Sequence, residues 1–362
     1  MTRRTEMFMH IYSVTPPSTG PEDMAESYRA RVTATAESCE SAGWHGILVP
    51  HNLHEVDPWL IAGHLGSVTS DLVPLIAVQP ASMAPHTAAA MAAAYATLYG
   101  RPLYFNLVAG ARDDELRRTG DLLSHDQRYA RMREYGRTLR ALLRGELLDE
   151  EGEWYAYRQF RLEPRPEVLS DCKIFVAGSS AAGLSVAKDI ADVVVTHPAP
   201  VDAWLDDFLT PLRAGGYRGD LGIRIGIIAR SDSTAAWDAA RERFPESWRG
   251  RQETLLKTVS QNSWARQLAV RAVAEEEAPA DTAGTDVYWL GAFRSGQASA
   301  PFLVGSHEEV ADRLAAYVEA GVGHVLLNGE AADDRGGIEE VLRLVRRQGC
   351  APDRPGSRAA AR

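Results

Sequence analysis

Cysteine is scarce in this sequence. The 362 residues include only Cys39, Cys172 and Cys350, which lie far apart and form no CxxC pair. A disulfide framework and a cysteine-ligated zinc site both need several cysteines at close spacing, so the composition argues against both. Free thiols fit a reducing compartment, and we expect a cytoplasmic protein.

Long apolar runs and an excess of positive charge are also missing. We find no segment long and apolar enough for a signal peptide or a membrane span. Lys plus Arg number 39 against 49 Asp plus Glu, a formal net charge of -10. Broad binding to nucleic-acid phosphates needs a basic face, which this balance disfavours. We therefore expect neither a membrane nor a nucleic acid among the partners.

Several catalytic motifs are absent as well. The chain has no GxGxxG fingerprint, no Walker sequence, no GxSxG elbow and no HExxH pair. Nucleotide-phosphate binding and serine hydrolase chemistry therefore gain no support from motifs. His51 and His54, with Glu55 and Asp57 beside them, come nearest to a metal-ligand cluster, but no further partner follows downstream. We expect no metal site.

Short apolar runs alternate with longer helical stretches through most of the chain. The runs are apolar throughout, as strands buried on both faces are. Such alternation indicates parallel strands with right-handed crossovers, and eight units match a TIM barrel. We predict one (βα)8 barrel domain over residues 1–350, an α/β fold, with strands at 7–12, 46–50, 73–78, 103–108, 173–177, 193–196, 223–228 and 324–327.

Two segments depart from this rhythm. Residues 146–165 are typical of a helix end followed by a short hairpin. The seventh and eighth strands are separated by about 95 residues, far more than one crossover needs. We predict a helical insertion over about 231–300 whose small and polar end, 278–300, forms a mobile lid loop. The tail over 351–362 is expected to be disordered.

The active site of a βα barrel lies where strands end and the following loops begin. Ser179 and Ser180 precede a helix, where hydroxyls and backbone amides suit a phosphate, although serine is also an ordinary helix N-cap. Ser124 is a candidate N-cap of the long helix predicted to start at His125, with Gln127 as its capping-box partner. Further polar residues at or near strand ends are Asp57, Gln79, Asn106, Thr196, His197 and Arg224.

Six segments, in this order, resemble the bacterial luciferase-like flavin monooxygenases, and most closely the alkanesulfonate monooxygenases. No single segment is specific, but the FNLV, HxxRY and GSS elements together are fairly specific. The segments are 43–50 (GWHGILVP), 57–60 (DPWL), 105–110 (FNLVAG), 123–129 (LSHDQRY), 175–180 (FVAGSS) and 223–226 (IRIG).

This resemblance implies a barrel that binds reduced FMN delivered by a separate NAD(P)H:FMN reductase. Asn106 and Gln79 would face the isoalloxazine ring, with Asp57 nearby. The residues that would hold the ribityl phosphate are His125, Tyr129, Ser179 and Ser180. Bound reduced FMN would react with oxygen to a flavin peroxide or hydroperoxide and oxygenate a small organic substrate.

The departures from the alkanesulfonate pattern concern the catalytic groups. Glu55, with His54 beside it, stands where that branch has a cysteine, and Gly226 replaces its strand-seven histidine. The tyrosine that the alkanesulfonate monooxygenases have after strand eight, within a Gly-Tyr-Pro sequence, is missing here, where residues 329–331 are Gly-Glu-Ala. Arg224 and an arginine of the lid, Arg294, are retained. We predict Arg224, Arg294, Glu55 and His54 as catalytic residues, and the replacements disfavour desulfonation.

Arg224 is the most constrained of these residues because it lies within an apolar strand. An unpaired guanidinium would be costly there, so it must meet a protein carboxylate, such as Glu55 or Asp57, or a ligand. We favour a ligand, and expect Arg224 and, after lid closure, Arg294 to hold an anionic or hydrogen-bond-accepting group of the substrate.

The sequence favours the first of three functions, a two-component FMN-dependent monooxygenase. The second is a deazaflavin-dependent oxidoreductase of the same superfamily, which moves a hydride without oxygen. The third is a flavin-binding homologue without activity, motivated by the three replaced positions. The helix over 87–95 has scarcely a polar side chain, so we also expect a homodimer or homotetramer.

Overall fold

The computed structural model describes residues 9–18, 25–53, 55–110, 113–178, 180–260, 263–277, 286–329 and 332–349. Within them, eight parallel strands form a closed barrel, in which β9 joins both β8 and β12. All eight predicted strands are confirmed. They are β1 (His10–Val14), β2 (Gly46–Val49), β3 (Val73–Val78), β4 (Tyr104–Leu107), β7 (Ile174–Ala177), β8 (Val193–Thr196), β9 (Asp220–Arg230) and β12 (Val322–Leu327).

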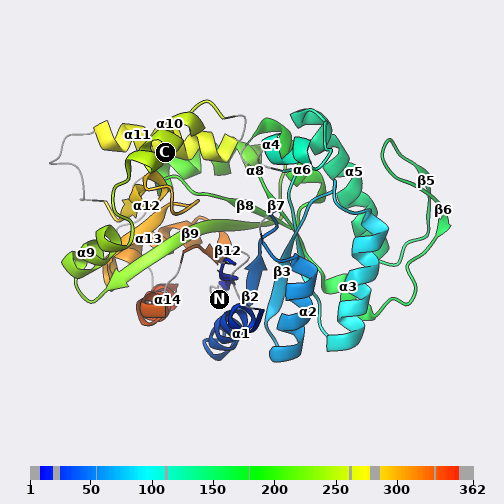
Figure 1. Cartoon of the computed structure of the whole chain (residues 1–362), viewed down its shortest axis with the longest axis horizontal. Helices are drawn as coiled ribbons and strands as arrows, with labels where there is room; N and C mark the ends of the chain where they lie inside the picture. The colour runs from blue at the N-terminus through cyan, green and yellow to red at the C-terminus, as the bar shows by residue number, and fades with distance from the viewer. Residues whose placement is uncertain are drawn as a thin grey trace, which may run out of the picture.

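Helices cover the outside of this barrel (Figure 1). The apolar strands need cover on both faces, which accounts for the predicted crossovers. The long covering helices are α1 (Ala25–Ser41), α2 (Pro58–Val68), α3 (Pro85–Tyr99), α5 (His125–Leu143), α6 (Ala181–Ile190), α13 (His307–Glu319) and α14 (Arg335–Gly349). Shorter turns are α4 (Asp113–Arg118), η1 (Glu167–Asp171), α7 (Val201–Trp204), the π-helical η2 (Leu205–Leu209), α8 (Thr210–Ala214) and η3 (Ala332–Asp334).

Strand side chains alternate between the barrel interior and the layer under the helices. Tyr12, Leu75 and Phe175 pack in a cluster made of strand residues alone, whereas Ile11 and Ile76 join the large cluster that includes the helices. Because successive side chains point to opposite faces of a strand, this alternation fixes which polar residues point inward near the strand ends.

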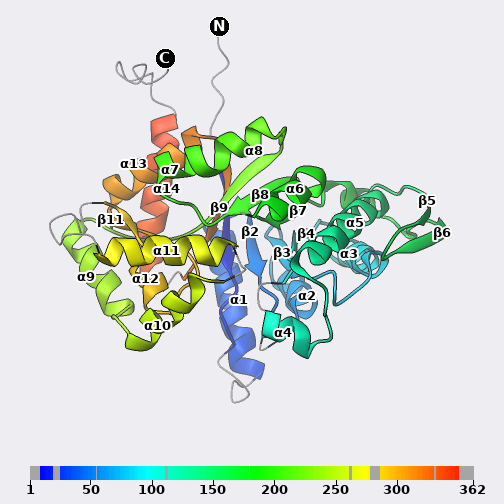
Figure 2. The ribbon, with the colours of Figure 1, turned by 90° about the horizontal axis from the view of Figure 1, so that it is seen from above.

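The predicted hairpin is also present. Strands β5 (Leu148–Glu151) and β6 (Ala156–Phe160) pair antiparallel and project from one side of the molecule, beside α5 (Figure 2). Figure 2 also shows the segments inserted after β9 gathered on the opposite side, so the barrel lies between the hairpin and the insertion.

The insertion after β9 is helical, as predicted, but its second half is not an unpacked loop. It consists of α9 (Ser233–Arg243), α10 (Trp248–Lys257), α11 (Ser263–Glu277), β10 (Tyr288–Trp289) and α12 (Gly291–Arg294), followed by β11 (Phe302–Ser306). Trp289, Leu290 and Phe293 are buried, and β10 pairs with β11. The predicted loop is therefore wrong for 286–300, where these apolar side chains pack, and the action of the segment as a lid stays a prediction. Residues 278–285 and the tail 351–362 lie outside the described part.

Strand β9 connects the insertion to the barrel. Its first half pairs with β12 and its second half with β11. The fully buried carboxylate of Asp334 accepts hydrogen bonds from Arg230, at the end of β9, and from Arg243, at the end of α9. A buried carboxylate shared by two guanidinium groups holds these elements together.

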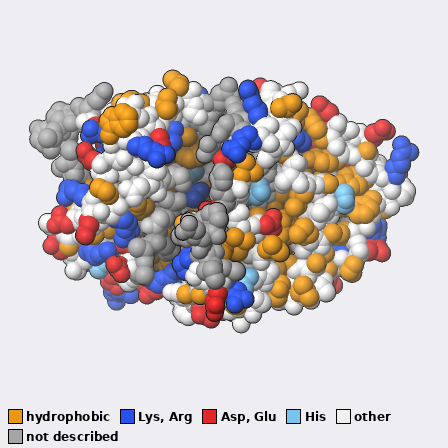
Figure 3. Space-filling view, viewed as in Figure 1, with side chains coloured by type: hydrophobic (Ala, Val, Ile, Leu, Met, Phe, Trp, Pro, Cys, Tyr) orange, Lys and Arg blue, Asp and Glu red, His pale blue; other side chains and the backbone are white. Residues whose placement is uncertain are grey.

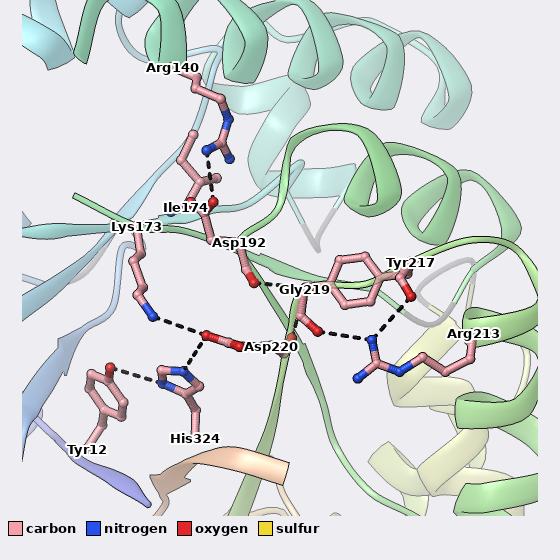
Figure 4. Close-up of polar contacts among 10 residues, drawn as sticks. All are labelled: Tyr12, Arg140, Lys173, Ile174, Asp192, Arg213, Tyr217, Gly219, Asp220 and His324. Carbon is pink, nitrogen blue, oxygen red and sulfur yellow. Dashed lines mark hydrogen bonds and ion pairs between the residues drawn. The ribbon is translucent and has the colours of Figure 1, made fainter. Parts of the chain in front are cut away.

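A polar cluster closes the amino-terminal end of the barrel (Figure 4). The Tyr12 hydroxyl lies 3.2 Å from the Nδ1 atom of His324. The His324 Nε2 atom lies 3.5 Å from a carboxylate oxygen of Asp220, and the Lys173 ammonium group pairs with the same oxygen at 3.1 Å. The rings of His10 and His324 are stacked at 4.8 Å. In TIM barrels this end serves stability rather than chemistry.

Among the described residues, no helix combines the length and apolar character that crossing a bilayer requires.

Candidate active site

Four inward-facing polar residues lie at the carboxyl ends of the barrel strands. Asn106 follows the interior residue Tyr104 by two positions, and Gln79 follows Leu75 by four. His197 follows the interior Val195 by two positions, and Arg224 lies between the outward-facing Ile223 and Ile225. The alternation of strands therefore directs all four side chains into the catalytic end of the barrel.

The turn between β7 and α6 forms the anion-binding corner of this end. Ser180 is the N-cap of α6 and accepts a hydrogen bond from the Gly183 amide at 3.0 Å, so the capping interpretation is confirmed. A Cβ atom on Gly183 would lie 3.1 Å from the Ser180 hydroxyl and 3.3 Å from that of Tyr129. Glycine at this position thus lets two hydroxyls converge at the positive end of a helix. Ser179 lies outside the described residues.

Tyr129 and His125 reach this corner from the start of α5. The predicted capping box of Ser124 and Gln127 is present and fixes where that helix begins. The two rings are 4.8 Å apart, and the His125 Nδ1 atom lies 2.9 Å from a carboxylate oxygen of Asp126. Burial raises the pKa of Tyr129, and its hydrogen bond with Ser180 opposes that shift. Tyr129 is therefore a neutral hydroxyl at physiological pH, able to donate to an anion.

Gln79 and Asn106 line the adjacent part of the site. Ala77 of β3 pairs in register with Asn106 of β4, so Gln79 and Asn106 are near neighbours across these strands. Gly110 has a φ of 92°, and a Cβ there would lie 2.8 Å from the Gln79 amide nitrogen. This close approach requires glycine and holds the amide against the backbone.

Asp57 and Glu55 have partners within the chain. The Asp57 carboxylate caps α2 by accepting from the Trp59 amide at 2.9 Å. Glu55 accepts from the Ser18 amide at 2.9 Å. Neither pairs with Arg224, so the alternative in which one of them neutralises that arginine finds no support in the geometry. His54 lies outside the described residues.

Arg224 makes no hydrogen bond or ion pair with any residue that the structure describes, and its Nε atom is sealed from solvent. Burial lowers the pKa of this guanidinium to about 10, which still leaves it charged at physiological pH. Arg224 as a whole is partly exposed, but its sealed Nε–H needs an acceptor that the described residues do not supply.

Arg294 lies in the insertion and not at the end of a barrel strand. It is the last residue of α12, and it contacts a carboxylate oxygen of Glu275 and the Ala272 carbonyl oxygen, each at 3.4 Å. It lines a cavity of about 870 Å³ within the insertion, together with aromatic residues such as Tyr288 and Trp289. No described contact joins it to Arg224, and its joint action with Arg224 stays a prediction.

His197 is the site residue whose importance the sequence did not reveal. Its ring stacks on Trp264 of α11 with centroids 4.3 Å apart, and its Nε2 atom is sealed from solvent without a partner among the described residues. Burial and the nearby Arg224 lower the pKa of His197 to about 3. Its place directly after a strand was visible in the sequence, but its neighbours come from distant segments.

Comparison with known proteins identifies the family. A family model described as luciferase-like monooxygenase matches residues 9–324, most of the chain. The chain belongs to the luciferase-like monooxygenase family. It is 34% identical, over 301 residues, to the 4-(gamma-L-glutamylamino)butanoyl-[BtrI acyl-carrier protein] monooxygenase BtrO of Niallia circulans, covering 83% of this chain and 86% of that protein. As a member of this family, the chain is a luciferase-like monooxygenase.

Solved structures confirm the TIM-barrel fold. Riboflavin lyase (RcaE), solved with modified FMN and riboflavin, has a TM-score of 0.71 at 14% identity, covering 96% of this chain and 94% of that one. An F420-dependent secondary alcohol dehydrogenase, in complex with an F420-acetone adduct, has a TM-score of 0.63 at 17% identity, covering 94% and 98%. Because proteins with two different cofactors share the fold, the fold alone does not determine which cofactor this luciferase-like chain binds.

Proposed function

We propose that this luciferase-like enzyme is a two-component monooxygenase that binds reduced FMN and uses oxygen to oxygenate a small organic substrate. The observation that carries the proposal is the corner at α6, where the hydroxyls of Ser180 and Tyr129 converge over Gly183 at a helix N-terminus. A terminal phosphate is the group that such a corner fits best. FMN ends in a phosphate and, when reduced, supplies the reaction with oxygen.

The remaining residues have positioning roles in this proposal. Asn106 and Gln79 face the isoalloxazine ring, Asp57 keeps the start of α2 in place, and His125 supports Tyr129. In a two-component enzyme of this kind, a separate NAD(P)H:FMN reductase supplies the reduced cofactor. The likeness to the acyl-carrier-protein-dependent relative supports an acyl substrate with an anionic or hydrogen-bond-accepting group.

Titration with each reduced cofactor tests this function. We expect reduced FMN to bind in the micromolar range or tighter under anaerobic conditions, and reduced deazaflavin F420 to bind at least about tenfold more weakly, because the site is built around a terminal phosphate. The absorbance spectrum after mixing the FMN complex with oxygen is the second measurement. A preference for the deazaflavin, or oxidation at the rate of free FMN with no oxygenated product, would contradict the proposal.

Variants of the α6 corner test how the phosphate is held. Tyr129→Phe and Ser180→Ala each remove one hydroxyl, and we expect each to weaken reduced-FMN binding by about fivefold to tenfold, the value of one ordinary hydrogen bond of about 1 kcal/mol. Thr97→Val, on the outer side of α3, is the matched control because it also removes a hydroxyl. Unchanged FMN affinity in both corner variants would place the phosphate elsewhere.

We also propose that the enzyme forms a homodimer or homotetramer through the face of α2 and α3. Hydrophobic side chains gather on this part of the surface (Figure 3), including Leu60 and Leu98, which are 71% and 73% exposed. The other face of α3 is packed against the barrel, so its apolar composition is only partly explained by internal packing.

A further inference from the structure

His197 and Arg224 are neighbours at the catalytic end of the barrel. Strands β8 and β9 pair in parallel with Thr196 opposite Ile223, so the next residues, His197 and Arg224, lie side by side on the inward face. The charge of the neighbouring Arg224 also lowers the pKa of the His197 imidazole. These residues come from adjacent strands and present their polar atoms to the same region.

Each of the two carries a buried nitrogen without a partner. The Nε atom of Arg224 and the Nε2 atom of His197 have no hydrogen-bond partner among the described residues, although both are sealed from solvent. A buried polar atom without a hydrogen bond lowers the stability of the folded protein. Two such atoms side by side point to a bound group that forms hydrogen bonds with both. The Nε–H of arginine can only donate, so that group must present an acceptor.

His197 is suited to be a second donor. Next to a permanent cation and away from water, the imidazole stays neutral, as its lowered pKa also indicates. A neutral imidazole keeps one N–H, and when that proton is on Nε2 it can donate into the same region as Arg224. The pair then carries a single positive charge with no carboxylate against it among the described residues.

The insertion completes this arrangement. Trp264 of α11 lies flat on the imidazole with an angle of 19° between the ring planes. The indole covers the ring on one face, which restricts its rotation and keeps water away. A substrate held by His197 would therefore lie between the barrel and the insertion, on the β8–β9 side, whereas the proposed FMN residues lie on β3, β4 and the β7–α6 turn.

We propose that His197 and Arg224 together form the binding site for a carboxylate of the substrate, with His197 as the second donor beside Arg224. A carboxylate offers an acceptor oxygen to each donor, and its negative charge neutralises the positive charge of Arg224. This inference rests on the proposed function, in which Arg224 faces the substrate, and adds the chemical class of the group and the residue that shares it.

Binding of two small probes, without turnover, tests the inference. Butanoate and butanamide have the same shape and differ in charge, and each is titrated by calorimetry into the anaerobic reduced-FMN complex and into the protein without flavin. We expect butanoate to bind at least about tenfold more tightly than butanamide, and Arg224→Met to abolish that difference. Because no oxygen chemistry is involved, a failure of the FMN proposal would leave the flavin-free titration interpretable.

The variants of His197 isolate its donor. The amide nitrogen of glutamine occupies nearly the place of Nε2, whereas that of asparagine corresponds to Nδ1. His197→Gln should therefore keep butanoate affinity within about threefold, and the matched control His197→Asn should lose about tenfold. In Arg224→Met, exchanging Gln for Asn at 197 should have little further effect, because both donors serve one group. Affinity for reduced FMN should not change in any of these variants.

Four outcomes would overturn the assignment. They are equal binding of butanoate and butanamide, equal affinity in the Gln and Asn variants, failure of the wild-type protein to bind butanoate at all, and a loss of FMN affinity in His197→Asn. The last result would show that the pair faces the cofactor.

Discussion

Replacing Arg224 with methionine is expected to lower kcat/KM by about 100- to 1,000-fold, toward whichever substrate the wild-type enzyme turns over, while affinity for reduced FMN stays within about twofold. The reason is that Arg224 has no counter-charge among the described residues, and its Nε atom has no acceptor. The ligand, rather than the protein, would use this charge. Methionine fills a similar volume without the charge, so the barrel should still fold.

Steady-state kinetics together with an anaerobic FMN titration measure this effect. Arg224→Lys keeps the charge but loses the planar donor pattern, and we expect it to retain an intermediate activity. Wild-type turnover in Arg224→Met would reject the substrate role. A parallel loss of FMN affinity would instead assign the arginine to the cofactor.

Acid is expected to destabilise the folded protein strongly below about pH 6.5. At the amino-terminal end of the barrel, burial lowers the pKa of His45 to about 4, and it also lowers the pKa of His10 and of His324, on which Lys173 acts in the same direction. The nearby carboxylate of Asp220 opposes the shifts of His10 and His324 but does not reverse them. These rings are therefore neutral in the folded protein at neutral pH.

The direction of the effect follows from proton uptake. Well above pH 6.5 these histidines are neutral in both the folded and the unfolded chain, so they do not influence stability there. As the pH falls from 6.5 toward 4, the unfolded chain binds protons that the folded chain does not, and each such proton costs about 1.4 kcal/mol per pH unit. Allowing for partial solvation of the rings, we expect the free energy of unfolding to fall by roughly 3 kcal/mol between pH 6.5 and 5. His197, at the opposite end, adds to the same trend.

Denaturant unfolding at several pH values measures this slope. His45 contacts the rings of His10, Tyr12 and Tyr104, so His45→Phe keeps an aromatic ring there and removes one titrating group. We expect the slope to become shallower by about one proton between pH 6.5 and 5. His86→Gln, an exposed position on α3, should leave it unchanged. A pH-independent stability down to pH 5 would contradict the argument.

The barrel itself could be read from the sequence because its signals are local. Each strand is a short apolar run buried on both faces, and each helix between them is long enough to cover the sheet. The capping box of Ser124 and Gln127 and the N-cap at Ser180 involve residues three apart, so the spacing alone predicts them. Periodicity could not foresee that 286–300 packs into the insertion, since β10 depends on pairing with β11.

The eight strands, the insertion after the seventh barrel strand, and the polar residues at strand ends are predictable because they follow from patterns within a few neighbouring residues. Which of those polar residues have partners depends on tertiary contacts. Glu55 binds the Ser18 amide, Arg294 binds Glu275, and Arg224 and His197 keep unpaired buried nitrogens. Pairing and burial arise from segments far apart in the chain, and the closing of the barrel brings them together.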